Sequence, residues 1–155
     1  MGPSTLSFVA WAVQGKTMTA NTQSNTEELP AHTCWELLRQ TPVGRLAIVA
    51  DGHPDIFPVN YVVDHGTVVF RTAAGTKLAG TLRHDVAFEA DGYDSEDGTA
   101  WSVVLKGRAE RIVEPTDSIS AMSLGLTPWQ DGNKPWFLRI VASSLTGRRV
   151  HVAQH

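Results

Sequence analysis

The sequence predicts one mostly β domain with short helices, whose strands form an antiparallel barrel. Its length of 155 residues fits a single domain. Runs of β-branched and aromatic residues follow one another with only turn residues between them. We count about six strands and three short helices, and the strands do not alternate with long helices. That order favours an antiparallel barrel over a doubly wound parallel sheet.

Residues 1–30 are predicted to be a disordered leader, which leaves residues 31–155 as the domain. Residues 16–28 are mostly polar and cannot bury enough surface to offset their ordering entropy. The apolar stretch Leu6–Val13 is far shorter than the ~20 residues that a membrane helix needs. No Lys or Arg precedes it, as a signal peptide would require. Met18 is an alternative start of translation.

The first elements of the domain follow from local signals. Thr33–Glu36 has the pattern of a capping box and predicts a helix over 34–40, which Pro42 ends. An antiparallel meander is predicted from strands at 43–50, 56–63 and 67–72. Pro58 cannot donate a hydrogen bond to a neighbouring strand, so the second strand needs an edge, a bulge or a break there.

Helical spacing returns from Gly75 to Arg83, where Leu78 and Leu82 lie four residues apart. The remaining expected elements are strands at 86–90, 100–113 and 136–150 and a third helix between Pro115 and Gly125. We interpret the acidic segment 91–98 as a solvated turn, because calcium loops need a stricter ligand spacing.

Composition excludes several classes of function. The net charge of -3 argues against a general nucleic-acid binder, and no segment predicts a membrane span. The single cysteine, Cys34, excludes an intramolecular disulfide and favours a cytoplasmic protein. The six histidines are scattered, so we assign no metal site. Because GxSxG, GxxxxGK[ST] and GxGxxG are all absent, hydrolase, triphosphatase and Rossmann functions lack their signatures.

A phosphate site is predicted where the strand at 67–72 runs through Gly75 into the expected helix. Arg71 and Lys77 supply cations there, and Thr72 and Thr76 supply hydroxyl donors. The helix would add its first amides and the positive end of its dipole. This donor set suits a phosphomonoester. Plain helix capping calls for the same Thr and Gly residues, so both interpretations stay open at this point.

Pro58, Val59 and Asn60 form a second candidate site. In a strand interrupted by proline, neighbouring amides can face a cavity, and the Asn60 side chain both donates and accepts hydrogen bonds. A flat heterocycle with polar edges would suit such a site. The alternative is a simple bulge with Tyr61 in the core, which spacing alone favours.

Two stretches of the chain resemble the pyridoxamine 5′-phosphate oxidase-like proteins of the flavin-binding split β-barrel superfamily. They are VGRLAIVADGHPDIFPVNYVVDHGTVVFRTAAGTKLAG at 43–80 and WSVVLKGRAERI at 101–112. The chain looks closest to the small bacterial branch that includes the nitroimidazole-resistance proteins. The similarity extends loosely from Cys34 to Arg149.

This resemblance implies a six-stranded antiparallel split β-barrel that forms a homodimer, with two FMN molecules in clefts between the subunits. The residues implied to hold the FMN phosphate are Arg71, Thr72, Thr76 and Lys77. Those implied to lie along the ring edge are Pro58, Val59 and Asn60. Trp101 and Ser102 would approach from the facing strand or from the other subunit.

The resemblance further implies an FMN-dependent, flavin reductase-like oxidoreductase that passes electrons from a reduced nicotinamide to a small organic acceptor or to oxygen. No catalytic residue is assigned. Vitamin B6 oxidation is disfavoured, because Gly75-Thr76-Lys77 replaces a Ser-Arg-Lys cluster and the C-terminal arginine-rich substrate segment is missing. The alternatives are a deazaflavin-dependent reductase or a noncatalytic flavin or haem module, for which His84 or His151 would be the axial ligand.

Overall fold

The computed structural model describes residues 25–73, 75–113 and 136–152, which form strands, one α-helix and a short 3₁₀ turn. In chain order the elements are β1 (Thr26–Leu29), α1 (Ala31–Gln40), β2 (Val43–Ala50), β3 (His53–Asp64), β4 (Thr67–Thr72), the 3₁₀ turn η1 (Ala79–Thr81), β5 (Asp85–Asp94), β6 (Thr99–Arg111) and β7 (Trp136–His151).

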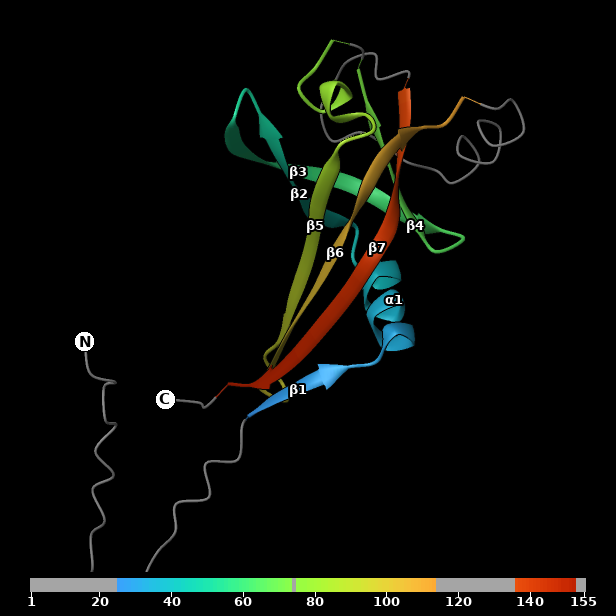
Figure 1. The fold of residues 1–155 in the computed structure, drawn as a ribbon. Coiled ribbons are helices and arrows are strands. Elements are labelled where there is room, and N and C mark those ends of the chain that lie inside the picture. Colours follow the sequence, from blue (N-terminus) through green and yellow to red (C-terminus); the bar gives the residue numbers. More distant parts are fainter. Residues whose placement is uncertain (1–24, 74, 114–135, 153–155) are drawn as a thin grey trace, which may run out of the picture.

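The strands form one antiparallel sheet that closes on itself. Their order is β1-β7-β4-β3-β2-β5-β6, and β6 also pairs with β7, so that six strands make a ring and β1 lies outside it. In Figure 1, β5, β6 and β7 run the length of the molecule, while the β2–β3 hairpin projects to one side. The predicted antiparallel split barrel is therefore confirmed.

The interior of the ring is filled by large apolar side chains from every strand of the ring. Those without exposed surface include Leu46, Phe70, Phe88, Leu105 and Leu138. Tyr61 is 4% exposed, and its hydroxyl donates a hydrogen bond to the Leu38 carbonyl at 2.7 Å, which ties α1 to β3. This confirms that Tyr61 lies in the core.

The predicted capping box is wrong, because α1 begins three residues before the expected helix. Its N-cap is Pro30, with no side-chain cap bond, and Thr33 is a helical residue. The Cys34 amide already donates to the Pro30 carbonyl at 3.1 Å. Residues 26–29, expected in the leader, form β1, which pairs with β7. Their polar side chains suit this strand because only Leu29 is buried.

The predicted helix over 75–83 is also wrong, since only the three-residue turn η1 forms. Gly75 and Arg83, at the two ends of the expected helix, take positive φ angles of 77° and 66°, and Leu82 leaves the helical region with a ψ of 131°. The Arg83 amide donates to the Ala109 carbonyl at 2.7 Å, which draws this end of the segment to β6. The expected third helix at 115–125 lies outside the described residues.

The predicted strands are confirmed, two with the expected bounds and four that differ at their ends. Both β2 and β4 match, whereas β3 starts at His53 and β5 runs to Asp94, so each includes residues expected in turns. Among the described residues, no cluster of His, Cys, Asp or Glu could hold a metal ion. No helix in the same residues is long and apolar enough to cross a membrane.

Candidate functional site: the β3–β4 fork

The two candidate segments meet where β3 and β4 diverge. These strands pair only from Tyr61↔Phe70 to Asp64↔Thr67. Beyond that point β3 stays with β2, while β4 stays with β7. We call residues 55–60 of β3, together with residues 71–73 and 75–77 that follow the last β3–β4 pair, the β3–β4 fork. A fork leaves backbone edges without a strand partner, which are available to other groups.

Pro58 occupies the half of β3 that has a strand on one side only. Its partner is Arg45 of β2, and the β3–β4 pairing starts three residues later. The predicted edge at Pro58 is therefore confirmed. Pro58 is exposed, Asn60 is half-buried, and the Val59 side chain turns into the core with 8% of its surface exposed.

Two threonine hydroxyls organise the loop after β4. The Thr76 hydroxyl donates to the Ala73 carbonyl at 2.8 Å and accepts from the Ala79 amide at 3.2 Å. The Thr72 and Thr76 hydroxyl oxygens lie 2.9 Å apart. Because the Thr76 proton goes to Ala73, Thr72 is the donor in this contact. The local capping role, left open by the sequence, is thus real for Thr76.

A salt bridge connects the two sides of the fork. The Lys77 Nζ donates to the Asp55 Oδ2 at 2.8 Å, with Lys77 after β4 and Asp55 on β3. The hydrogen bond from Lys77 lowers the pKa of Asp55, and Asp55 in turn raises the pKa of Lys77. A second cation, Arg71, lies with its guanidinium 5.2 Å from the centre of the Phe137 ring.

The donors at the fork fit a phosphate, although in a different way from the sequence prediction. Since η1 has only three residues, the expected dipole of a helix N-terminus is missing. An ammonium and a guanidinium remain within a short segment, and each can donate to phosphate oxygens, whereas the Thr72 and Thr76 protons are used inside the loop. A side chain at Gly75 would meet no atom within 4 Å, so the loop surface is open there.

Trp101 and Ser102 lie far from the phosphate side of the fork within one chain. They pair with Arg149 and Arg148 of β7, whereas Thr72 pairs with Trp136 at the other end of that strand. At about 3.3 Å per residue, these positions of β7 are roughly 40 Å apart along the strand. Within one chain they are therefore remote from the phosphate residues. Pro58 is nearer to them, because its partner Arg45 contacts Asp91 at 3.2 Å, and Asp91 pairs with Ser102.

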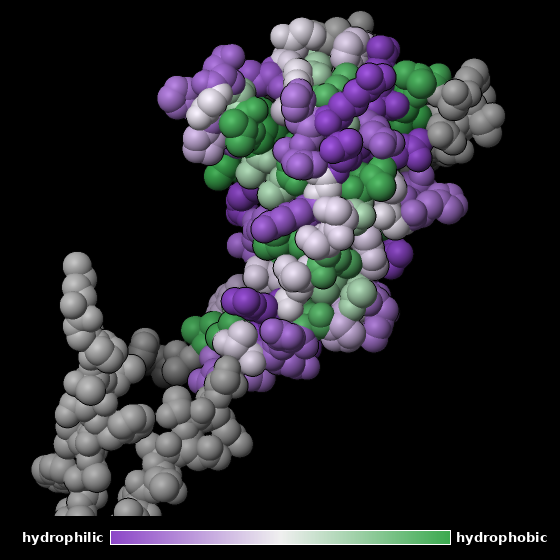
Figure 2. All heavy atoms as spheres, in the orientation of Figure 1, coloured by the Kyte–Doolittle hydropathy of each residue, from purple (hydrophilic) through white to green (hydrophobic). Residues whose placement is uncertain are grey.

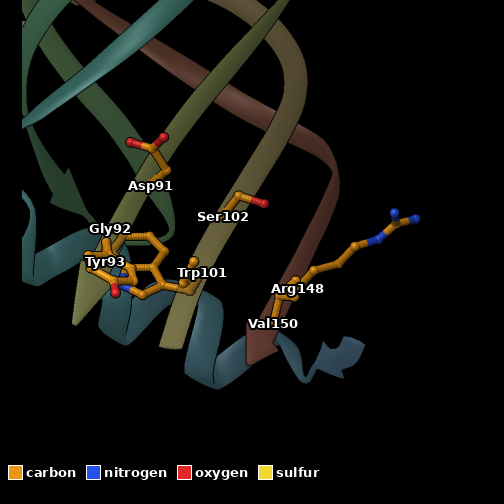
Figure 3. A pocket seen from close by; sticks show the side chains of 8 residues that line it. Asp91, Gly92, Tyr93, Trp101, Ser102, Arg148 and Val150 are labelled. Carbon is orange, nitrogen blue, oxygen red and sulfur yellow. The ribbon is translucent and has the colours of Figure 1, made fainter. Parts of the chain in front are cut away.

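Trp101 and Ser102 line a separate pocket of about 380 Å³ at the end of β5, β6 and β7 (Figure 3). The other lining residues are Asp91, Gly92, Tyr93, Ala100, Arg148 and Val150. Gly92 leaves room for the indole, because a Cβ there would lie 2.5 Å from the Trp101 Nε1. Figure 3 shows the Trp101 ring over Gly92 and the Arg148 side chain extending away from it.

Sequence reasoning missed Asp55 at the fork and Asp91 and Arg148 at the pocket. Asp55 meets Lys77 across 22 residues of sequence, and the pocket residues come from three strands. No local pattern signals such contacts. The strand pairing would have been needed to find them.

Known proteins resemble the chain in both sequence and structure. A family model described as "Pyridoxamine 5'-phosphate oxidase" matches residues 30–149. An uncharacterised protein of Mycobacterium tuberculosis is 31% identical over 129 residues, which cover 79% of this chain and 84% of that protein.

Two solved structures are described as FAD-binding proteins. The one from Mycobacterium smegmatis is 37% identical with a TM-score of 0.73, covering 82% of this chain and 100% of that one. The one from Mesorhizobium loti is 25% identical with a TM-score of 0.65, covering 81% of this chain and 98% of that one.

Proposed function

Because the chain belongs to the pyridoxamine 5′-phosphate oxidase family, we propose that it binds a flavin nucleotide at the β3–β4 fork and is an oxidoreductase. The observation that carries this proposal is the contact of Lys77 with Asp55. The contact shows that the loop after β4 lies beside β3, three residues before Pro58, so that one elongated ligand could reach both. The two similar FAD-binding structures support a flavin as that ligand.

In this proposal the residues of the fork bind different parts of the flavin. Lys77 and Arg71 face the phosphate, and the Thr72–Thr76 hydroxyl pair keeps the loop in place beside it. Pro58 and Asn60 lie along the edge of the ring, where the exposed backbone of β3 can meet its polar atoms. The bound flavin supplies hydride and electron transfer. The electron donor would be a reduced nicotinamide, and the acceptor a small organic molecule or oxygen.

The site would be completed by a second copy of the chain. Roughly 40 Å of β7 separates Trp101 and Ser102 from the phosphate side of the fork in their own chain, so a second subunit would have to bring them to it. Exposed apolar side chains on the projecting β2–β3 hairpin support a homodimer: Val49 is 69% and Ile56 is 63% exposed. Figure 2 shows hydrophobic surface among the hydrophilic residues of this hairpin. A flavin-loaded monomer in sedimentation would contradict this arrangement.

The form of the flavin is a finer part of the proposal. The sequence favours FMN, since the fork presents one compact set of phosphate donors. The two similar structures described as FAD-binding favour a dinucleotide. The absorption spectrum of the purified protein, followed by release and chromatography of the bound ligand, tests flavin binding and separates FMN from FAD. The proposal would be overturned by a deazaflavin spectrum. It would also be overturned if the purified protein carried no flavin and bound none when flavin was added.

A haem module is the weaker alternative. The histidines offered for it stand at opposite ends of the β5–β6 pair, with His84 just before Asp85 and His151 paired with Thr99. Each would therefore place a haem at a different end of this pair, and neither end is the fork. Turnover distinguishes an oxidoreductase from a storage module: we expect reduced nicotinamide to bleach the flavin absorbance. The single cysteine, Cys34, which is free, supports a reducing, cytoplasmic location.

A further inference from the structure

We propose that Asp55 is a specificity-determining residue of the fork: its carboxylate competes with the ligand phosphate for Lys77 and so reduces the advantage of phosphorylated over unphosphorylated flavins. This inference rests on the proposed function. Neither the family resemblance nor the phosphate donor set includes Asp55.

The geometry gives Lys77 a partner before any ligand arrives. Its ammonium lies 2.8 Å from the Asp55 Oδ2, within the strongest range for a charged hydrogen bond. Asp55 is itself held in place, because its Oδ1 accepts the amide of Ile56 at 3.1 Å. A carboxylate fixed in this way remains beside Lys77 rather than turning into solvent.

The charges then decide the direction of the effect. A phosphomonoester carries about −1.5 to −2 charges at pH 7. To reach Lys77 it must displace Asp55, which costs the ion pair, or share the ammonium with Asp55, which places a second anion beside the first. Riboflavin has no phosphate and meets no such cost. Asp55 therefore lowers the affinity for FMN and leaves that for riboflavin unchanged.

The pair is exposed, which sets the size of the effect. The Lys77 side chain is 62% and the Asp55 side chain 35% exposed, so water and salt screen their attraction. The free energy that an exposed ion pair contributes corresponds to a change of about two- to fivefold in an equilibrium constant. We expect Asp55→Asn to tighten FMN binding by this factor, since the amide keeps the shape of the side chain and loses its charge.

The experiment is a titration of the full-length protein, stripped of bound flavin, with FMN and with riboflavin. The variants are Asp55→Asn, Lys77→Ala and the double variant, and Asp55→Glu should restore wild-type behaviour. Asp64→Asn is the matched control, because Asp64 lies on the same strand, contacts His65 at 2.7 Å and stands at the end away from the fork.

The proposal expects the ratio of riboflavin to FMN dissociation constants to rise in Asp55→Asn and not in Asp64→Asn. The rise should vanish when Lys77 is already Ala, and it should shrink at high salt. An unchanged or lower ratio in Asp55→Asn would overturn the inference, as would a rise that persists without Lys77. If neither wild type nor any variant binds FMN or riboflavin, both the proposed function and this inference fail. If wild type binds FMN and Asp55→Asn binds it equally well, only this inference fails.

Discussion

The β6–β7 seam and the β3–β4 fork use the same kind of strand in opposite ways. Across the seam, the pairing runs from Thr99↔His151 to Arg111↔Leu138, and the backbones approach so closely at Gly107 that a Cβ would lie 2.0 Å from the Val141 oxygen. At the fork the pairing stops, and exposed charged groups, Asp55 and Lys77, take the place of the ladder. The difference suggests a division of roles, in which the closed part of the ring supplies stability and the open part is the site of the proposed flavin binding.

The strongest test of this division removes a side chain from the closed part. Phe88 of β5 has no exposed surface, and its ring meets Tyr61 edge to face with centroids 4.7 Å apart. We expect Phe88→Ala to lower the free energy of unfolding by about 3–5 kcal/mol, because it leaves a cavity in the ring. Urea unfolding measures this loss. Tyr93→Ala, on the same strand with 60% of Tyr93 exposed, is the control and should change little. A small loss for Phe88→Ala would contradict the comparison.

A second test adds one methyl group between β6 and β7. In Gly107→Ala the new Cβ meets backbone, the Val141 oxygen and carbonyl carbon, which cannot move aside like a side chain. We expect a loss of about 1–3 kcal/mol in the same unfolding experiment. Gly80→Ala is the matched control, since a Cβ at Gly80 meets nothing within 4 Å. If both variants have the same free energy of unfolding, then β6 and β7 can move apart at little cost, and their pairing is not the rigid part of the ring.

The sequence predicts the closed part better than the open part, for physical reasons. The strands β2 and β4 carry dense runs of β-branched residues, and their bounds follow directly. The helical spacing of Leu78 and Leu82 wrongly predicts a helix after β4, because contact with the barrel, and not a helix, accounts for their partial burial. Asp55 and Lys77 are 22 residues apart and meet only because of how the strands pair. The sequence therefore predicts Lys77 as a donor at the fork, but it does not predict Asp55 as its partner.

The third prediction concerns the open part. We expect Lys77→Ala to weaken FMN binding by about tenfold, because one charge-assisted hydrogen bond to the phosphate is lost. Riboflavin affinity and urea unfolding should stay near wild type, since Lys77 is exposed and its ion pair contributes little to folding. Titration with both ligands measures the effect. Lys106→Ala, an exposed lysine of β6, is the control. Equal losses for FMN and riboflavin would show that the loop, and not a phosphate contact, had been damaged.

The smallest expected effect lies at Tyr61, in the last pair of β3 and β4 before the fork, where the two regions meet. Its buried hydroxyl donates to the Leu38 carbonyl, and burial raises the pKa of Tyr61 above its usual value of 10.0. The folded protein therefore holds this proton more tightly than the unfolded chain does. Stability from this group is fully present below about pH 10 and is lost as the pH rises further.

We expect Tyr61→Phe to cost about 1 kcal/mol at pH 7, for the lost hydrogen bond, and to reduce the decline in stability above pH 10. Urea unfolding of both proteins from pH 7 to pH 11 measures the two effects, with Tyr93→Phe as the exposed control. An equal decline in wild type and Tyr61→Phe would mean that the hydroxyl ionises without unfolding the β3–α1 contact, so that the boundary of the fork is as open as the fork itself.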